Sequence, residues 1–121
     1  MSAAALFRWT VIPELQQSLD LDRASALATV RELFDATLAP QLDAIERAAL
    51  EDPAALSLAA HRLRGGCMQL GAEALAAIAL RIEMGSDGLS SVVLIAELRA
   101  CCQATRDALR HGEPATDPLL T

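Results

Sequence analysis

The segment AHRLRGGCMQLGAE, residues 60–73, contains the side chains of this sequence that are best suited to chemistry. His61 is followed by Arg62 and Arg64, and then by the adjacent glycines Gly65 and Gly66. An imidazole nitrogen is a nucleophile near neutral pH, and guanidinium groups bind phosphate and carboxylate oxygens. These residue types suit a phosphate or an acidic partner, although each glycine costs about 1 kcal/mol relative to alanine inside a helix.

Helical geometry separates His61 from the core face of its own helix. At about 100° per residue, Arg64, Gly65 and Met68 fall within about 60° of His61, whereas the leucines of the apolar stripe lie opposite. A glycine one turn after the imidazole leaves space for a reactive group of another protein. We interpret this face as a docking surface; the alternative is a surface histidine on a helix that the glycines fray.

A carboxylate is expected at the level of His61 on the neighbouring helix. If residues 53–70 and 72–84 form a hairpin that turns at Gly71, helical rise places Glu83 beside His61. A carboxylate that accepts a hydrogen bond from one ring nitrogen fixes the tautomer and raises the basicity of the other nitrogen. The alternative is an exposed charge in the last turn of a helix, where the helix dipole disfavours it.

Apolar residues at helical spacing predict an all-α fold around this hairpin. A short helix is expected at IPELQQSL, and a long helix then runs from a cap at Asp20 or Asp22 to about Leu50. Pro40 lies inside the long helix and is expected to kink it or divide it in two.

The other helices are expected to begin at recognisable caps. EDP at residues 51–53 indicates a restart with Asp52 as the cap, and Ser90 or Ser91 is expected to open the last long helix, which ends at HGEP. Short connections between the main helices predict an antiparallel four-helix bundle with a short additional N-terminal helix.

Length and composition favour one helical domain. The chain has 121 residues, of which 53% are hydrophobic and only 2% aromatic, a balance typical of packed helices rather than a sheet. The bundle is expected to span residues 12–112, after an N-terminal arm or short helix at 1–11 and before a flexible tail at 113–121. One core and one histidine face explain the apolar pattern, so we expect a monomer.

Charge, cysteines and hydropathy bound the location and the partners. A net charge of −6 argues against nucleic acid and anionic lipid as partners. Cys67, Cys101 and Cys102 form an odd set without CxxC spacing, so we expect free thiols that fill the core in a reducing compartment. We find no signal peptide and no apolar run of the roughly 20 residues that cross a bilayer, and we expect a cytoplasmic protein without membrane insertion.

Metal binding and independent catalysis lack support. The residues three and four positions from His61 are not a set of metal ligands, so no metal site is expected. GCMQLGAE lacks the Lys-Ser/Thr pair of a nucleotide-binding loop, and no Ser/His/Asp set has local support. His111 is interpreted as a capping or solvent-exposed residue.

The residues around His61 resemble the histidine-containing phosphotransfer (HPt) domain of multistep phosphorelays. The family pattern is His, any residue, Leu, Lys, Gly, then small residues, Gly-Ala about ten positions after the His, and a Leu-rich helix ending in an acid or amide. The matching positions are His61, Leu63, Arg64, Gly65, Cys67, Leu70, Gly71, Ala72, Leu75 and Glu83. The resemblance extends from about Pro13 to His111. Arg64 departs from the usual lysine, which puts phosphate geometry and partner choice in doubt.

The resemblance implies a phosphoryl carrier without catalytic activity of its own. His61 would accept a phosphoryl group from a receiver-domain aspartate and pass it to another receiver, which supplies Mg²⁺, so no intrinsic cofactor is implied. Arg64 would balance the phosphate charge, Gly65 would admit the receiver and Glu83 would orient the imidazole.

The implied partners are response-regulator receiver domains and a hybrid sensor histidine kinase. Arg62 adds to the positive charge of the docking face, and Met68 is either a core-edge residue or an apolar contact for a receiver. The alternative function is a helical-bundle adaptor that docks a receiver or another signalling protein without carrying phosphate; a purely structural bundle is a third possibility.

Overall fold

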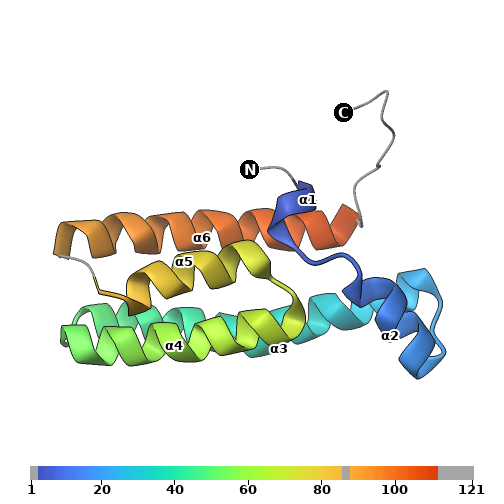
Figure 1. The fold of residues 1–121 in the computed structure, drawn as a ribbon, viewed down its shortest axis with the longest axis horizontal. Helices are drawn as coiled ribbons and strands as arrows, with labels where there is room; N and C mark the ends of the chain where they lie inside the picture. Colours follow the sequence, from blue (N-terminus) through green and yellow to red (C-terminus); the bar gives the residue numbers. More distant parts are fainter. Residues whose placement is uncertain (1–2, 86–87, 112–121) are drawn as a thin grey trace.

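All regular structure in the part of the chain that is described, residues 3–85 and 88–111 of this computed structural model, is helical. The helices are α1 (Ala3–Leu6), α2 (Val11–Leu19), α3 (Arg23–Ala49), α4 (Pro53–Leu70), α5 (Glu73–Glu83) and α6 (Gly88–His111) (Figure 1). The predicted all-α class is confirmed. The expected tail at 113–121 lies outside the described residues.

Aspartate caps start the two longest elements of the N-terminal half. Asp22 caps α3, where its side chain accepts a hydrogen bond of 2.7 Å from the backbone N–H of Ser25, and this bond lowers the pKa of the Asp22 carboxyl. Asp52 caps α4 in the same way, with a bond of 2.7 Å from the N–H of Ala55. Asp20, the other candidate, instead ends α2 with a φ of 55°.

Of the two effects expected of Pro40, a kink or a division of the long helix, the division does not occur. The helix runs without interruption from Arg23 to Ala49, with Pro40 inside it. Pro40 and Ala36 are both exposed, so water can satisfy the Ala36 carbonyl that loses its partner in the helix. The predicted start of α6 is also displaced, because the helix begins at Gly88, ahead of the serines; a capping residue type marks a helix end only approximately.

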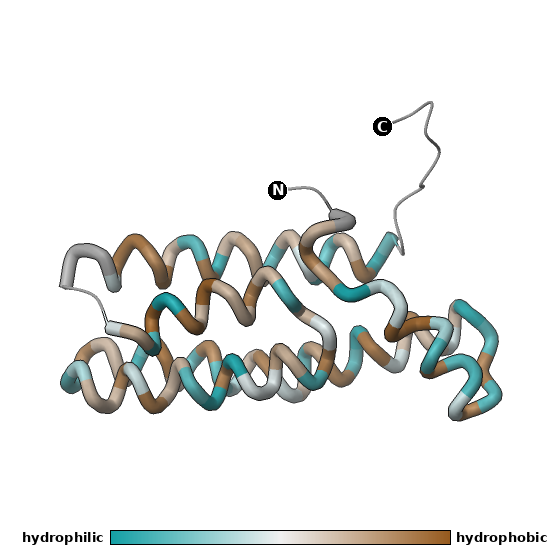
Figure 2. The backbone as a smooth tube through the Cα atoms, in the orientation of Figure 1, coloured by the Kyte–Doolittle hydropathy of each residue, from teal (hydrophilic) through white to brown (hydrophobic). Residues whose placement is uncertain are grey.

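Four helices form a closed ring of neighbours. α4 packs against α3 and α5, and α6 packs against the same two helices from the other side, while successive helices run in opposite directions (Figure 1). α2 packs on α3, and α1 packs on α5 and α6. Figure 2 shows hydrophobic residues recurring along α4, α5 and α6, which line the shared core. Each helix thus keeps one side for the core and another for solvent.

The N-terminal arm is part of the same hydrophobic core. Its buried side chains are Leu6, Phe7 and Trp9. The backbone N–H of Arg8 donates a 2.7 Å hydrogen bond to the carbonyl of Gly71, the residue that ends α4. Gly71 has a φ of 84°, and a Cβ there would lie 3.0 Å from Cγ2 of Val11 and 3.3 Å from Cβ of Arg8. A glycine is therefore required at this turn, because its φ is positive and because the N-terminal arm leaves no room for a Cβ.

None of the helices within residues 3–85 and 88–111 combines the length and the apolarity needed to cross a membrane.

Candidate functional site

His61 lies on the solvent side of α4, as the helical spacing predicts. Its side chain is 61% exposed, whereas Leu56, Leu63 and Cys67 on the opposite side of α4 are buried. The ring is therefore accessible to another protein, while its helix is held by the apolar face behind it.

Glu83 faces His61 from the end of α5. Its Oε1 lies 2.5 Å from Nδ1 of His61, and its side chain is only 17% exposed. The backbone carbonyl of Glu83 accepts a 2.8 Å hydrogen bond from the hydroxyl of Ser57, one turn before His61 on α4. The predicted proximity of Glu83 and His61 is confirmed. Because a carboxylate only accepts, this contact assigns the proton to Nδ1 and leaves the lone pair on Nε2.

Arg64 shares the Glu83 carboxylate with the histidine. Its Nη2 donates to Oε2 of Glu83 at 3.3 Å, so the two carboxylate oxygens have separate partners. Its Nη1 lies 3.9 Å from Sδ of Met68. The side chain is 29% exposed, and its Nε is buried without a hydrogen-bond partner among the described residues. Arg64 thus lies close to the imidazole, and its guanidinium has more N–H donors than these contacts use.

The two adjacent glycines have different surroundings. A Cβ on Gly65 would meet no atom within 4 Å, since Gly65 is exposed beside His61. A Cβ on Gly66 would lie 2.8 Å from Oε1 of Gln41 and 3.3 Å from Cδ2 of Leu38, both on α3. Gly66 therefore allows α4 to pack closely on α3, whereas nothing in the fold explains the cost of Gly65.

The remaining predicted site residues, Arg62 and Met68, lie on the same helix as His61. Arg62 is exposed, and Met68 is 59% exposed, which excludes a core-edge role for Met68. His111 is exposed at the end of α6, far along the sequence from the site, as expected for a solvent-exposed residue.

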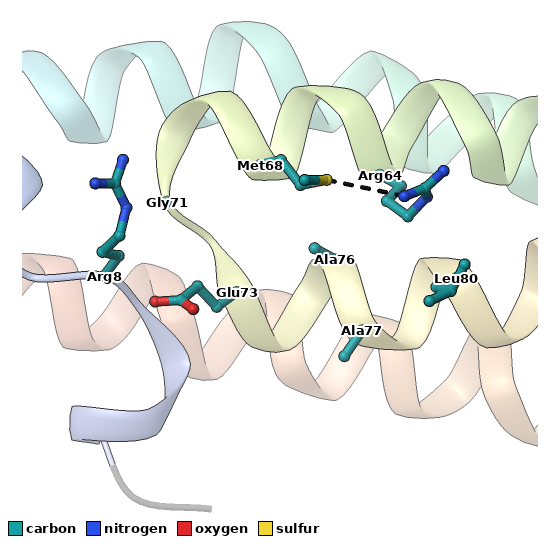
Figure 3. A pocket seen from close by; sticks show the side chains of 8 residues that line it. All are labelled: Arg8, Arg64, Met68, Gly71, Glu73, Ala76, Ala77 and Leu80. Atoms are coloured by element: carbon teal, nitrogen blue, oxygen red, sulfur yellow. Dashed lines mark hydrogen bonds between the residues drawn. The ribbon is translucent and has the colours of Figure 1, made fainter.

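Sequence reasoning missed a pocket beside the site. It has a volume of about 400 Å³ and lies between α4, α5 and the N-terminal arm (Figure 3). Its lining residues are Arg8, Arg64, Met68, Gly71, Glu73, Ala76, Ala77 and Leu80. The buried side chains of the arm and its backbone bond to the α4–α5 turn bring Arg8 here. No periodic pattern in the sequence signals that contact.

The cysteines are not candidates for the chemistry. All three are buried free thiols, as predicted. Burial, with the neighbouring thiols, raises the pKa of Cys67 from an ordinary value of 9.0 to about 12, and burial raises the pKa of Cys101 and Cys102 as well. A protonated buried thiol is a poor nucleophile. Among the described residues, no cluster of three or more His, Cys, Asp and Glu side chains is arranged to hold a metal ion.

Comparison with known families assigns the chain. The sequence matches the Hpt domain over residues 10–108, a range that covers most of its length and includes His61, Arg64 and Glu83. Comparisons with curated proteins and with solved structures found no match. The matched range, together with an exposed histidine on a helical scaffold, shows that this chain belongs to the Hpt domain family, whose members are phosphocarrier modules of phosphorelays.

Proposed function

We propose that this chain relays a phosphoryl group between receiver-domain aspartates and His61 in a two-component phosphorelay. The observation that carries the proposal is the exposed His61 ring, whose Nδ1 faces the Glu83 carboxylate at 2.5 Å. That contact leaves Nε2 as the nucleophilic nitrogen on the opposite edge of the ring.

The proposed transfer uses this arrangement as follows. The Nε2 lone pair attacks the phosphorus of an aspartyl phosphate on the receiver, the N–P bond forms, and the P–O bond to the aspartate breaks. The aspartate leaves as a carboxylate with the bonding electron pair. Positive charge develops on the ring, and the Glu83 carboxylate offsets it through the Nδ1–H. The reverse steps pass the phosphoryl group to a second receiver, and the receivers supply Mg²⁺.

Each neighbouring residue has a role in the proposal. Arg64 pairs with Glu83 in the free protein and is close enough in sequence, three residues after His61, to turn to phosphate oxygens once they are present. Gly65 leaves room for the receiver, because no atom of this chain fills the space where a Cβ would project. Arg62 and Met68 are exposed on the same helix and would contact the receiver.

The scaffold of the proposal is an antiparallel four-helix bundle over residues 12–112 that acts as a monomer in the cytoplasm. It requires no cofactor of its own, because it contributes a nucleophile and a docking face while the receiver contributes its metal ion and its catalytic residues. The partners are receiver domains of response regulators or of a hybrid sensor kinase.

The test is phosphoryl transfer to the purified chain. Receiver domains from the same genome are phosphorylated, mixed with the wild-type protein and with His61→Gln in the presence of Mg²⁺, and the label is followed. We expect an acid-labile, base-stable phosphoramidate on the wild-type chain and none on the variant. Binding of a receiver without labelling would instead establish the adaptor function and overturn the carrier.

A further inference from the structure

We propose that the pocket between α4, α5 and the arm, called here the α4–α5 pocket, receives an apolar side chain of the docked receiver together with a carboxylate next to it in the receiver. This inference rests on the proposed phosphotransfer function and names a contact that would select the receiver. It differs from the His61 face, since it involves the N-terminal arm and the far end of α5 (Figure 3).

The α4–α5 pocket lies where a receiver at His61 would cover it. Arg64 belongs to both sites, because it contacts Glu83 and also lines the pocket. His61 and Gly71 are ten residues apart, and a helical rise of about 1.5 Å per residue separates them by about 15 Å. An interface of ordinary size buries about 800 Å² on each partner, a patch roughly 30 Å across. A receiver that reaches the imidazole therefore extends over the pocket.

The floor of the pocket is apolar. Ala76, Ala77 and Leu80 of α5 and Met68 of α4 contribute side chains to it. Leu80 is 39% exposed and Met68 is 59% exposed, so both present apolar surface that the fold leaves uncovered. A volume of about 400 Å³ accommodates a large apolar side chain. Burial of such a side chain would supply the non-directional part of the binding free energy.

Arginines flank the pocket at both ends. Figure 3 shows Arg8 at the arm and Arg64 on α4, in a chain whose net charge is −6. Arg8 pairs with Glu14 at 3.6 Å, and both side chains are largely exposed, so the pair exchanges readily for another carboxylate. The occupant that fits is an apolar side chain flanked by a carboxylate.

The Glu73 carboxylate allows a test in which a substitution strengthens the binding of the receiver instead of weakening it. It is the one carboxylate among the lining residues and stands in the first turn of α5, where the helix dipole stabilises it. A carboxylate from the receiver would be repelled by Glu73 and attracted by Arg8. Removal of the Glu73 charge should therefore strengthen binding, whereas reversal of the Arg8 charge should weaken it.

The experiment uses the full chain and the receiver domain that labels His61 most rapidly among those of the same genome. The dissociation constant is measured by titration, and the initial rate of labelling is measured with the receiver phosphorylated. We expect roughly tenfold weaker binding for Arg8→Glu, with a smaller loss for Arg8→Gln, and a loss for Ala77→Gln, which fills the pocket. Glu73→Gln should bind several-fold more tightly, and the charge effects should shrink at high salt.

Matched controls lie on the α3–α6 side of the molecule. Arg99→Glu reverses a charge that pairs with Glu46, and Ala96→Gln enlarges an exposed alanine of α6. The arm stays attached in the Arg8 variants, because Arg8 is held through its backbone N–H. Thermal unfolding of every variant checks this.

The outcomes separate the two proposals. If Arg8→Glu and Ala77→Gln bind like their controls while His61 is still labelled, the pocket assignment is wrong and the carrier function stands. If no receiver labels wild-type His61, the carrier function is wrong and the pocket assignment is rejected with it.

Discussion

Gly65 and Gly66 are adjacent in sequence and differ in almost every structural respect. Gly66 faces α3, where an added Cβ would lie 2.8 Å from Oε1 of Gln41. Gly65 faces solvent next to His61, where an added Cβ would meet nothing within 4 Å. The first glycine of the pair is unexplained by the fold, and the second is explained by helix packing. A glycine thus indicates function only after the packing explanation has been tested and has failed.

The same contrast extends along α4 to its nucleophiles. His61 is 61% exposed and hydrogen-bonded, whereas Cys67 on the other side of the helix is fully buried. The side of the helix, rather than intrinsic reactivity, decides which of the two is available. The following predictions test this division between the outward and inward sides of α4, beginning with the largest effect.

Thiol labelling should distinguish the two sides most strongly. Because burial raises the pKa of Cys67 to about 12, the Cys67 thiol of the native protein should react with a thiol reagent at pH 8 at least about a hundredfold more slowly than the same thiol in urea. The unfolded thiol ionises around pH 9, so the stabilisation from keeping Cys67 neutral is complete below that pH. It is lost as the pH rises toward 12. Denaturant titrations from pH 7 to 10 check this sign; stability that does not fall would contradict it.

Loss of the Glu83 carboxylate should impair transfer without unfolding the protein. Glu83→Ala removes the acceptor at Nδ1, and we expect labelling of His61 to slow by roughly 10- to 100-fold, as for other partners that orient a histidine. Glu83→Gln keeps an acceptor oxygen and should restore part of the rate. The bond from Ser57 ends on the backbone carbonyl of Glu83 and is retained in both variants.

The control for this prediction is Glu97→Ala, which removes an exposed carboxylate paired with Arg81 at 3.1 Å. Initial rates of labelling are compared at saturating and at limiting receiver. A slow rate that persists at saturation assigns Glu83 to positioning of the ring. A defect that disappears at saturation would assign it to docking instead.

Pattern reasoning found the outward side of α4 more completely than the inward side. His61, Met68 and the level of Glu83 follow from helical period and rise, which are local properties. The reason for Gly66 depends on where Gln41 and Leu38 of α3 come to lie, and the contact of Arg8 with the α4–α5 turn depends on one backbone hydrogen bond across the fold. Such contacts between distant segments have no sequence period.

Pro40 teaches the same point about local rules. The pyrrolidine ring of Pro40 destabilises a helix interior because it removes a backbone hydrogen bond. The tertiary packing of α3 along its full length outweighs this loss. The local penalty of Pro40 follows from its residue type, whereas the packing that outweighs it depends on contacts with distant segments, which the sequence does not display.

Leucine substitutions should separate the roles of the two adjacent glycines, with a loss of stability at Gly66 and a loss of labelling rate at Gly65. Gly66→Leu forces a large side chain against Gln41 and Leu38 and should destabilise the fold by about 1–3 kcal/mol. Gly65→Leu projects into open space, so the free energy of unfolding should not fall, while the initial rate of labelling by a receiver should drop. Urea unfolding and labelling of both variants decide the matter. A stability loss at Gly65 equal to that at Gly66 would remove the distinction between the two glycines.

The smallest substitution, Gly65→Ala, should separate the effect on receiver approach from any effect on folding most clearly. Gly65→Ala adds a single methyl group where nothing lies within 4 Å, and the better helix propensity of alanine should stabilise the protein by about 1 kcal/mol. If Gly65 serves the approach of a receiver, the same variant should be labelled several-fold more slowly, because the methyl group stands between the imidazole and its partner. Thermal unfolding and labelling rates measured on one preparation test both halves. A variant that is both more stable and equally fast would leave Gly65 without a function, and the close approach of the receiver would have to be assigned to another part of α4.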